Sequence, residues 1–409
     1  MVPIWLDGVY REFAQALSRG RLPGSVLISG RAGAGVHELA ADCIRVYLCL
    51  APEAGRPCGA CRSCRLLAGL GHPDFAALLP SGGTAPAPAR TRDRSGGDDG
   101  APVIGSDGVL LHALGVVEER LRERLDGDDA AGTIRIDALR HLSSYLHESP
   151  VIGSRRAALI THAHLMQAAS ANALLKLFEE PPPGTLIILA ADAPERLLPT
   201  ILSRAFTLSA AQADPQQALE FVCSRGSVSR LQAQFALACA QGAPYTAQQL
   251  IVTGQDRLAA CFIRQLAQLA SAPSAHVLEA AVHSLLQLPR PRRLPLLWLT
   301  GMDILRYQAG FDRAQLPLLG SCRAAEDAAE AAEGHGAADA DAAAEDTDGT
   351  GLSLPELLAA LPRERLLLLL TELCRLQAEE RSAALPVRAD DAQLRTLLWE
   401  LAQPGGAPP

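Results

Sequence analysis

Four cysteines lie close together in the sequence, at Cys49, Cys58, Cys61 and Cys64. Two overlapping C-x₂-C steps place three thiols in one short segment, and eight residues separate this segment from Cys49. Four thiolates at about 2.3 Å form a closed structural zinc site with no open position for chemistry. A disulfide or unrelated free thiols are the alternatives, but a cytoplasmic chain favours metal because the cytosol keeps thiols reduced. We therefore predict one structural Zn²⁺ held by these four residues.

A glycine-rich turn follows the first apolar segment of the chain and holds Gly30, Gly33 and Gly35. Its first and last glycines fit the phosphate-binding motif G-x-x-x-x-G-K-[ST], but the lysine position is Val36 and the Mg²⁺-binding hydroxyl position is His37. Backbone N–H groups could still hold a phosphate, or the turn could serve the fold alone. We expect a vestigial phosphate loop that does not bind ATP productively.

A later apolar segment, residues 157–160, ends without the acidic residues that an ATPase uses to hold Mg²⁺ and orient water. It runs into Thr161, His162, Ala163 and His164. The two histidines suggest a metal, but no third ligand accompanies them in the sequence. Loss of the lysine, the hydroxyl and the acids together predicts an ATPase fold that does not hydrolyse ATP.

The segments that must position these residues alternate between strand and helix patterns as far as about residue 212. We expect strands at 26–28, 133–136, 156–160 and 186–189, and helices at 3–18, 36–48, 167–179 and from the N-cap Asp137 onward. Such alternation predicts a parallel α/β sheet. From about residue 213 only helical spacing remains, which predicts an all-helical C-terminal half.

Composition narrows the class of protein. The 409 residues are 48% apolar, enough for two or three domains with their own cores. An apolar run long enough to span a membrane is absent from the sequence, and the first residues do not resemble a signal peptide, so we expect a cytoplasmic protein. Aromatic residues make up only 4%, which disfavours a stacking surface for single-stranded nucleic acid.

Two low-complexity segments interrupt this framework, at about 81–108 and 324–350. The second holds nine acidic side chains and no Lys or Arg, so the net charge of −8 belongs to it and the rest of the chain is nearly neutral. Neither segment can bury enough apolar surface to offset the entropy of ordering it. We expect both to be disordered insertions.

Residues 169–181, followed by the strand pattern at 186–190 and by residues 199–204, resemble the bacterial clamp-loader ATPase family. The cysteine cluster after the first helix of the α/β domain fits the same family. The resemblance weakens beyond residue 212 and does not extend to the two insertions.

That family implies an AAA+ (P-loop NTPase-like) α/β domain followed by two all-α domains. The α/β domain would cover 1–212, with the zinc module at about 49–64. A helical lid would follow at 213–254 and a helical collar, used for oligomerisation, at 255–409.

Within this family, the degenerate loop and the retained Ser203-Arg204 pair resemble the stationary, non-hydrolysing subunit of DNA polymerase III clamp loaders. The resemblance implies partners: the gamma/tau motor subunits and the delta subunit in a hetero-pentameric ring. Such a ring loads the beta sliding clamp onto primed DNA within a polymerase (nucleotidyltransferase) complex. Arg204 would be an arginine finger for a neighbouring subunit's ATP, positioned by Ser203. Two departures are Ala205, where the family has cysteine, and Ala191, where a polar residue often ends the strand.

Two other functions stay open on the sequence. An ATP-hydrolysing motor subunit of the gamma/tau type would show ATP turnover by the isolated chain. A stand-alone zinc-knuckle DNA-binding protein would show salt-dependent DNA binding by the chain alone. Arg155 and Arg156, just before a strand pattern, could contact a phosphate backbone, although a solvated loop is the favoured interpretation.

Overall fold

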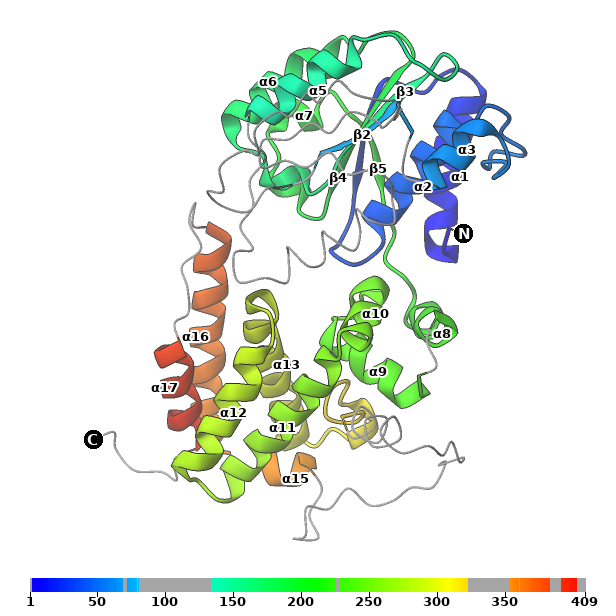
Figure 1. Cartoon of the computed structure of the whole chain (residues 1–409). Coiled ribbons are helices and arrows are strands. Elements are labelled where there is room, and N and C mark those ends of the chain that lie inside the picture. The colour runs from blue at the N-terminus through cyan, green and yellow to red at the C-terminus, as the bar shows by residue number, and fades with distance from the viewer. Residues whose placement is uncertain are drawn as a thin grey trace, which may run out of the picture. The chain divides into compact units, whose positions relative to one another are not determined.

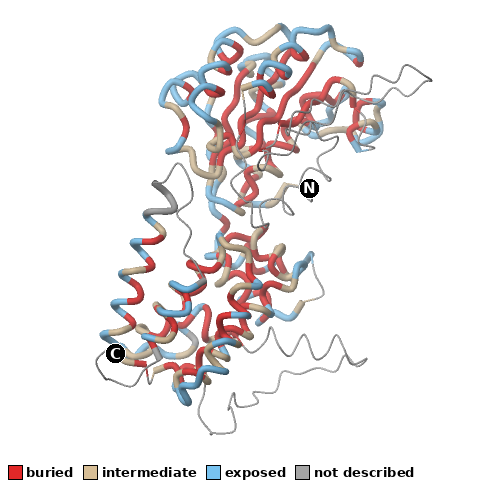
Figure 2. Tube along the Cα trace, turned by 60° about the vertical axis from the view of Figure 1, so that its left-hand side comes forward, coloured by how far each residue is buried: buried red, intermediate tan, exposed pale blue. Residues whose placement is uncertain are grey.

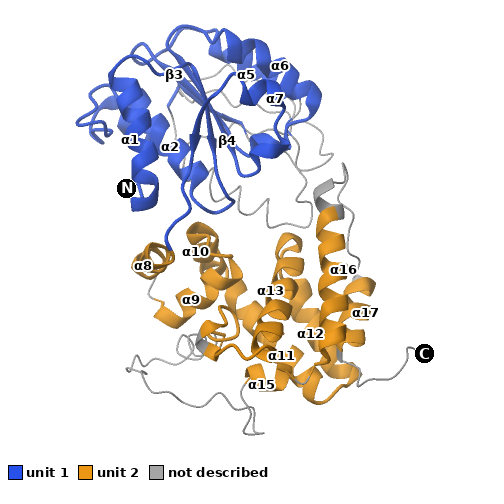
Figure 3. Cartoon of the chain, turned by 180° about the vertical axis from the view of Figure 1, so that it is seen from behind, with its two compact units in different colours: residues 1–214 blue, residues 215–409 orange. Residues whose placement is uncertain are grey.

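The computed structural model describes residues 2–68, 72–78, 80, 134, 136–225, 228–322, 354–359, 361–382 and 391–402. The chain divides into two compact units, residues 1–214 and 215–409 (Figure 3). The first is an α/β unit, and the regular elements of the second, within its described residues, are all helices, which confirms the predicted fold class.

The division into two units does not test the two predicted insertions or the predicted lid and collar. The insertions expected at about 81–108 and 324–350 lie outside the described residues. The separation of the helical half into a lid at 213–254 and a collar at 255–409 stays a prediction.

The first unit is built on a five-stranded parallel sheet in the order β2-β3-β4-β1-β5. The strands are β1 (Ser25–Ser29), β2 (Phe75–Leu78), β3 (Arg156–Ile160), β4 (Thr185–Ala191) and β5 (Phe206–Ser209). The four strands other than β5 are buried along their whole length (Figure 2), as expected for a parallel sheet covered on both faces. Because β1, β4 and β3 are parallel neighbours, their carboxyl ends meet at one edge of the sheet.

Helices cover both faces of this sheet (Figure 1). They are α1 (Ile4–Ser18), α2 (Val36–Leu48), α3 (Arg62–Ala68), α5 (Ile136–Leu146), α6 (Ala168–Glu179) and α7 (Pro199–Leu202). Side chains alternate between faces along a strand, so Val26 and Ile28 pack in one core with α1 and α2, whereas Leu27 packs in the other with α5 and α6. The strand therefore serves two cores.

The region before α5 differs from the sequence-based prediction. The strand expected at 133–136 is wrong: Ile134 makes only an isolated bridge with Met166, and α5 already begins at Ile136. Asp137 therefore lies in the first turn of the helix rather than at its N-cap. Residues 133 and 135 lie outside the described part of the chain.

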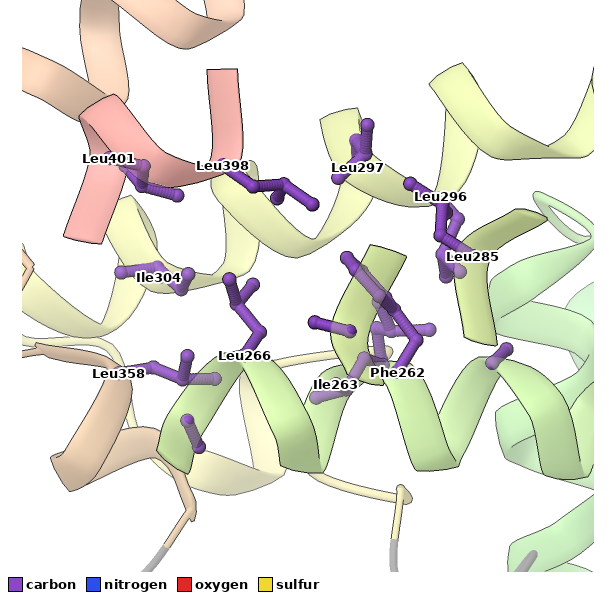
Figure 4. Packing of buried hydrophobic residues seen from close by; sticks show 14 of the residues in the cluster. Phe262, Ile263, Leu266, Leu285, Leu296, Leu297, Ile304, Leu358, Leu398 and Leu401 are labelled. Carbon is purple, nitrogen blue, oxygen red and sulfur yellow. The ribbon is translucent and has the colours of Figure 1, made fainter. Parts of the chain in front are cut away.

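The second unit is built of helices, and one apolar cluster joins most of them. The helices are α8 (Pro215–Arg225), α9 (Arg230–Cys239), α10 (Pro244–Val252), α11 (Gln255–Ser271), α12 (Ala275–Gln287), α13 (Arg290–Gln308), α15 (Leu354–Ala359), α16 (Arg363–Ser382) and α17 (Asp391–Ala402). Phe262, Ile263 and Leu266 of α11 belong to the same buried cluster as Leu285 of α12 and Leu398 of α17 (Figure 4). None of the helices in the described ranges is long and apolar enough to cross a membrane.

Candidate functional site

The four predicted cysteine ligands converge just beyond the C-terminal end of α2. Their sulfur atoms all lie within 4.8 Å of one another. The Sγ atom of Cys49 is 3.6 Å from that of Cys58 and 4.0 Å from that of Cys61. Two sulfurs on one tetrahedral ion, with bonds of about 2.3 Å, are about 3.8 Å apart. The predicted ligand set is thus brought together with the spacing needed to hold one metal ion.

Backbone N–H groups in this knuckle, residues 49–64, point at the sulfur atoms. The N–H of Cys58 donates to Cys49 Sγ at 3.3 Å, and the N–H groups of Cys61 and Cys64 donate to Cys58 Sγ and Cys61 Sγ, each at 3.4 Å. Gly59, with a φ of +72°, permits the tight turn between two of the ligands. Such hydrogen bonds stabilise the thiolate form that binds a metal.

The pKa values of the thiols reflect this arrangement. Burial raises the pKa of Cys49, and it raises the pKa of Cys64 to about 12. Burial also acts on Cys61, but hydrogen bonds from backbone N–H groups and neighbouring thiols outweigh it and lower its pKa to about 6. Cys61 is therefore more readily deprotonated than Cys49 or Cys64.

A buried polar chain ties the knuckle to the sheet. The N–H of Asp74 donates to His72 Nδ1 at 3.1 Å, so His72 carries its proton on Nε2, which lies 2.9 Å from Ser63 Oγ. The Ser63 hydroxyl in turn donates to the Leu48 carbonyl at 2.7 Å. Ser63 stands between two of the cysteine ligands, so this chain fixes the knuckle against both α2 and the start of β2.

The glycine turn lies between β1 and α2, as predicted. Gly33 and Gly35 have φ values of +73° and +100°, which favour glycine. At Gly30 a Cβ would lie 2.9 Å from side-chain atoms of both Val36 and Ala210, so the close packing there also requires glycine. The three glycines thus shape the strand–loop–helix turn. That this turn does not bind ATP productively stays a prediction.

The positions that would bind a nucleotide are occupied by other interactions. Val36, at the lysine position, is buried in the apolar core with a relative exposure of 1%. His37, at the hydroxyl position, makes a 3.1 Å contact from Nε2 to Asp192 Oδ2. The indole N–H of Trp5 donates to the loop carbonyl of Ala34 at 2.9 Å. The lysine ammonium that would reach a nucleotide's phosphates is absent at position 36, and the contacts of Trp5, Val36 and His37 hold the loop in place.

Three of the side chains at this edge of the sheet form a second cluster of metal-ligand types. His37 comes from the first turn of α2, His162 follows β3 and Asp192 follows β4; their ligand atoms all lie within 4.8 Å of one another. His162 Nε2 is 3.4 Å from Asp192 Oδ2, and its ring stacks on His37 with centroids 4.2 Å apart. The expectation that no third ligand accompanies His162 is therefore wrong.

Burial and mutual charge set the pKa values in this cluster. Burial, together with the neighbouring His37, lowers the pKa of His162 to about 3. Burial would raise the pKa of Asp192, but the facing histidines outweigh it and lower that pKa to about 2. At neutral pH the cluster thus holds an ionised carboxylate beside a neutral imidazole. The sequence signal that could have identified the cluster is a ligand-type residue just beyond each of two strands, His162 and Asp192, together with His37 at the start of the helix that follows β1.

Arg204 and Ser203 follow the short helix α7 on the surface of the first unit. The Nε of Arg204 is 2.6 Å from a carboxylate oxygen of Glu179, and the side chain is about two-fifths exposed. Arg204 Nη1 and Ser203 Oγ both donate to the Thr200 carbonyl, at 3.3 and 3.1 Å. Ser203 does not contact the guanidinium through any of these bonds, and both residues stay candidates for the predicted role.

Neither sequence-based alternative describes Arg156. It is the first residue of β3 and is 2% exposed. Its guanidinium lies 3.2 Å from Asp74 Oδ1 and donates to the carbonyls of Tyr145 and Ser149. The side chain is therefore an internal ion pair rather than a solvated cation or a phosphate contact.

The α/β unit of the chain resembles proteins of a known family. Residues 6–214, just over half of the chain, match the family described as DNA polymerase III, delta subunit. DNA polymerase III subunit delta′ of Escherichia coli is 27% identical over 246 residues, covering 60% of this chain and 60% of that protein. The delta′ subunit of Haemophilus influenzae is 26% identical over 261 residues, covering 64% and 65%. The chain therefore spans about three-fifths of these curated relatives.

Subunits of another type also match. DNA polymerase III subunit gamma/tau of Mycobacterium tuberculosis is 30% identical over 198 residues, covering 48% of this chain and 26% of that protein. Among solved structures, a gamma subunit-related protein of Thermotoga maritima aligns with a TM-score of 0.41 and 15% identity, covering 98% of this chain and all of that chain.

Proposed function

The chain belongs to the DNA polymerase III delta-subunit family, and we propose that it is a delta-prime subunit of the clamp loader that does not hydrolyse ATP. In this role it is a stationary member of a hetero-pentameric ring with gamma/tau motor subunits and a delta subunit. The motors use ATP to load the beta sliding clamp onto primed DNA. The relatives named delta′, which match about 60% of the chain, support this choice.

One observation carries the proposal: the chain's own side chains take the places of the groups that bind Mg²⁺ and ATP. Val36 packs into the core where a lysine would extend toward the phosphates, and His37 bonds to Asp192 where a hydroxyl would bind the metal. Phosphoryl transfer depends on positioned positive charge and Mg²⁺ acting together. A loop without the lysine, and without the hydroxyl that holds Mg²⁺, lacks the two side chains that stabilise this transition state in a working phosphate loop.

Arg204 gives the subunit an active role in catalysis by its neighbour. A guanidinium from an adjacent subunit neutralises the charge that develops on the transferred phosphoryl group. Arg204 is exposed and already lies at the end of a surface helix, although it must first leave Glu179, with which it pairs in the isolated chain. An exposed ion pair of this kind is worth about 0–1 kcal/mol, so its exchange for an ATP phosphate costs little.

The four-cysteine knuckle binds one Zn²⁺ in this proposal. Thiolate ligands select Zn²⁺ over hard cations such as Mg²⁺. All four positions of a tetrahedral ion are filled by protein, so the metal holds the fold and takes no part in a reaction.

A gamma/tau motor subunit is the second candidate, because the mycobacterial gamma/tau relatives show 30% identity over 198 residues. A motor must bind and hydrolyse Mg²⁺-ATP in its own loop. The two candidates therefore differ in the turnover of the isolated chain.

Reconstitution tests the proposal. The chain should co-elute from a sizing column with gamma/tau and delta subunits, and the complex should load clamps. Arg204→Ala should assemble normally but lower DNA- and clamp-stimulated ATP turnover. One arginine finger is worth about 10³–10⁵ in kcat at its own site, and the loss in the complex should be smaller because other sites keep their arginines.

The matched control is Arg140→Ala, which removes another exposed arginine, on α5, that pairs with Asp137. It should leave both turnover and clamp loading unchanged. Arg204→Lys should restore little activity, because an ammonium does not reproduce the planar guanidinium. Arg204→Ala complexes that assemble and then turn over ATP and load clamps at the unmutated rate would contradict the assigned role.

A further inference from the structure

We propose a second metal site, formed by His37, His162 and Asp192 at the carboxyl edge of the sheet, for a divalent transition cation such as Zn²⁺. These residues come from three separate segments: the first turn of α2 and the turns after β3 and β4. The site is distinct from the cysteine knuckle, which lies beyond the other end of α2. It would exist whichever clamp-loader subunit the chain represents.

The distances from the carboxylate oxygen to the two imidazole nitrogens are those of a coordination sphere, and all three ligand atoms lie within 4.8 Å of one another. Asp192 Oδ2 is 3.1 Å from His37 Nε2 and 3.4 Å from His162 Nε2. For bonds of about 2.0–2.1 Å, two ligands on one tetrahedral ion are about 3.3 Å apart. An ion between these three atoms would therefore need only small movements of the side chains.

Two further observations indicate that this edge is incomplete without a ligand. The second carboxylate oxygen of Asp192, Oδ1, is buried and accepts no hydrogen bond within the described structure. An unsatisfied buried acceptor is unfavourable, and a bound cation would satisfy it. His162 has a φ of +46°, a left-handed conformation that is uncommon for residues other than glycine and that concentrates at functional sites.

A simple ion pair between one histidine and Asp192 explains less of the arrangement. One imidazole would be enough for such a pair, yet two stacked imidazoles face the same carboxylate oxygen. Two imidazoles and one carboxylate are ligands suited to Zn²⁺ and similar transition metals, whereas Mg²⁺ prefers oxygen. The site is therefore a different one from the Mg²⁺-nucleotide site that a working phosphate loop would provide.

A bound ion would have a structural consequence. It would cross-link the start of α2 to the ends of the neighbouring strands β3 and β4. Without an ion, Asp192 contacts both histidines and the two histidine rings stack on each other. The hydroxyl position of the loop would then be engaged by a metal that carries no nucleotide. This would hold the loop of a non-hydrolysing subunit in one conformation without ATP.

Metal titration of the full-length chain tests the inference, with Zn²⁺ and Co²⁺ as the probes. The unmodified chain should bind two equivalents of Zn²⁺. His162→Gln and Asp192→Asn should each bind one, because loss of a direct ligand should weaken the second site by more than the 10–100-fold that loss of an outer partner costs. His164→Gln is the matched control, since this half-buried neighbour lies outside the three-ligand cluster, and it should still bind two.

Co²⁺ separates the two sites spectroscopically, because only the cysteine site gives thiolate-to-metal charge-transfer bands. A second equivalent that adds ligand-field bands without more charge transfer supports a histidine–carboxylate site, even where a variant fails to fold. A chain that binds one equivalent only, or His162→Gln and Asp192→Asn proteins that fold and keep two, would overturn the proposal.

Discussion

The two ends of α2 carry sites that differ in how complete they are. Beyond its C-terminal end, four sulfur atoms stand at the spacing of a tetrahedral metal site. At its N-terminal end, the glycine turn keeps its backbone shape, while Val36 and His37 replace the groups that would bind Mg²⁺ and phosphate. One site has four ligand-type side chains in place, whereas the other lacks the lysine and the hydroxyl of the phosphate-binding motif.

The two sites differ in what their side chains contribute to the stability of the protein. A structural metal contributes its binding free energy to folding, so loss of a ligand is felt by the fold itself. A nucleotide-binding lysine contributes nothing to the core, and replacing it by Val36 adds buried apolar surface. A subunit that does not need to hydrolyse ATP can therefore lose the second site and gain packing, whereas it cannot lose the first without cost.

Removal of the metal from the knuckle should have the largest effect. Structural zinc contributes on the order of 10 kcal/mol to the folding of small zinc modules. Chelation, or Cys61→Ser, should unfold residues 49–64 and open them to proteases, while the sheet persists. Limited proteolysis and far-UV circular dichroism report the two parts separately. Less than one metal equivalent in the unmodified chain, or an unchanged cleavage pattern after chelation, would remove the distinction between the two ends of α2.

Loss of Asp74 should have the next largest effect, and on the sheet rather than the knuckle. Its carboxylate accepts from the N–H groups of Val151 and Ile152, at 2.7 and 2.6 Å, and pairs with the buried Arg156. Removing one partner of a buried pair costs about 3–5 kcal/mol. Asp74→Ala should lower the free energy of unfolding by this amount in urea denaturation.

Glu148→Ala is the control for Asp74→Ala. Its carboxylate also faces Arg156, at 3.7 Å, but its side chain is 69% exposed. Exposed pairs are worth about 0–1 kcal/mol, so this variant should unfold almost as the unmodified chain does. Equal losses in the two variants would mean that burial does not decide the strength of the pair.

A smaller effect is expected at the connection between the knuckle and the sheet. Ser63→Ala removes the hydroxyl that accepts from His72 Nε2 and donates to the Leu48 carbonyl. An unsatisfied buried N–H costs about 1–3 kcal/mol. Thermal unfolding of the metal-loaded protein should show this loss, whereas Ser18→Ala, which removes an exposed hydroxyl, should change stability by less than about 0.5 kcal/mol. If the two variants melt alike, the polar chain does not fasten the knuckle.

The sequence allowed the cysteine site to be predicted because its ligands are near one another in the chain. Cys49 and Cys64 lie within sixteen residues of each other, and the C-x₂-C steps restrict the local backbone. The cluster of His37, His162 and Asp192 spans most of the α/β unit, so only the strand order β3-β4-β1 brings its members together. Without that order, His37 could be interpreted only as the residue that replaces the Mg²⁺-binding hydroxyl of the phosphate-binding motif.

The same contrast applies to the fold. Long buried strands such as β4 have enough consecutive apolar residues to be predicted. The four-residue strands β2 and β5 do not, because a short apolar run carries little periodicity. Arg156 shows a further limit of prediction from sequence. A cation next to a strand pattern suggests a solvent-exposed side chain, but Arg156 is buried and pairs with Asp74, which lies 82 residues away in the chain.

Whether the chain hydrolyses ATP is decided by steady-state ATP hydrolysis of the purified chain, with Mg²⁺ and in the presence and absence of primed DNA. We expect no turnover above that of buffer. We also expect none after Val36→Lys, because the hydroxyl and the acidic groups would still be missing. Mg²⁺-dependent turnover by the isolated, unmodified chain would contradict a non-hydrolysing subunit and would favour a motor of the gamma/tau type.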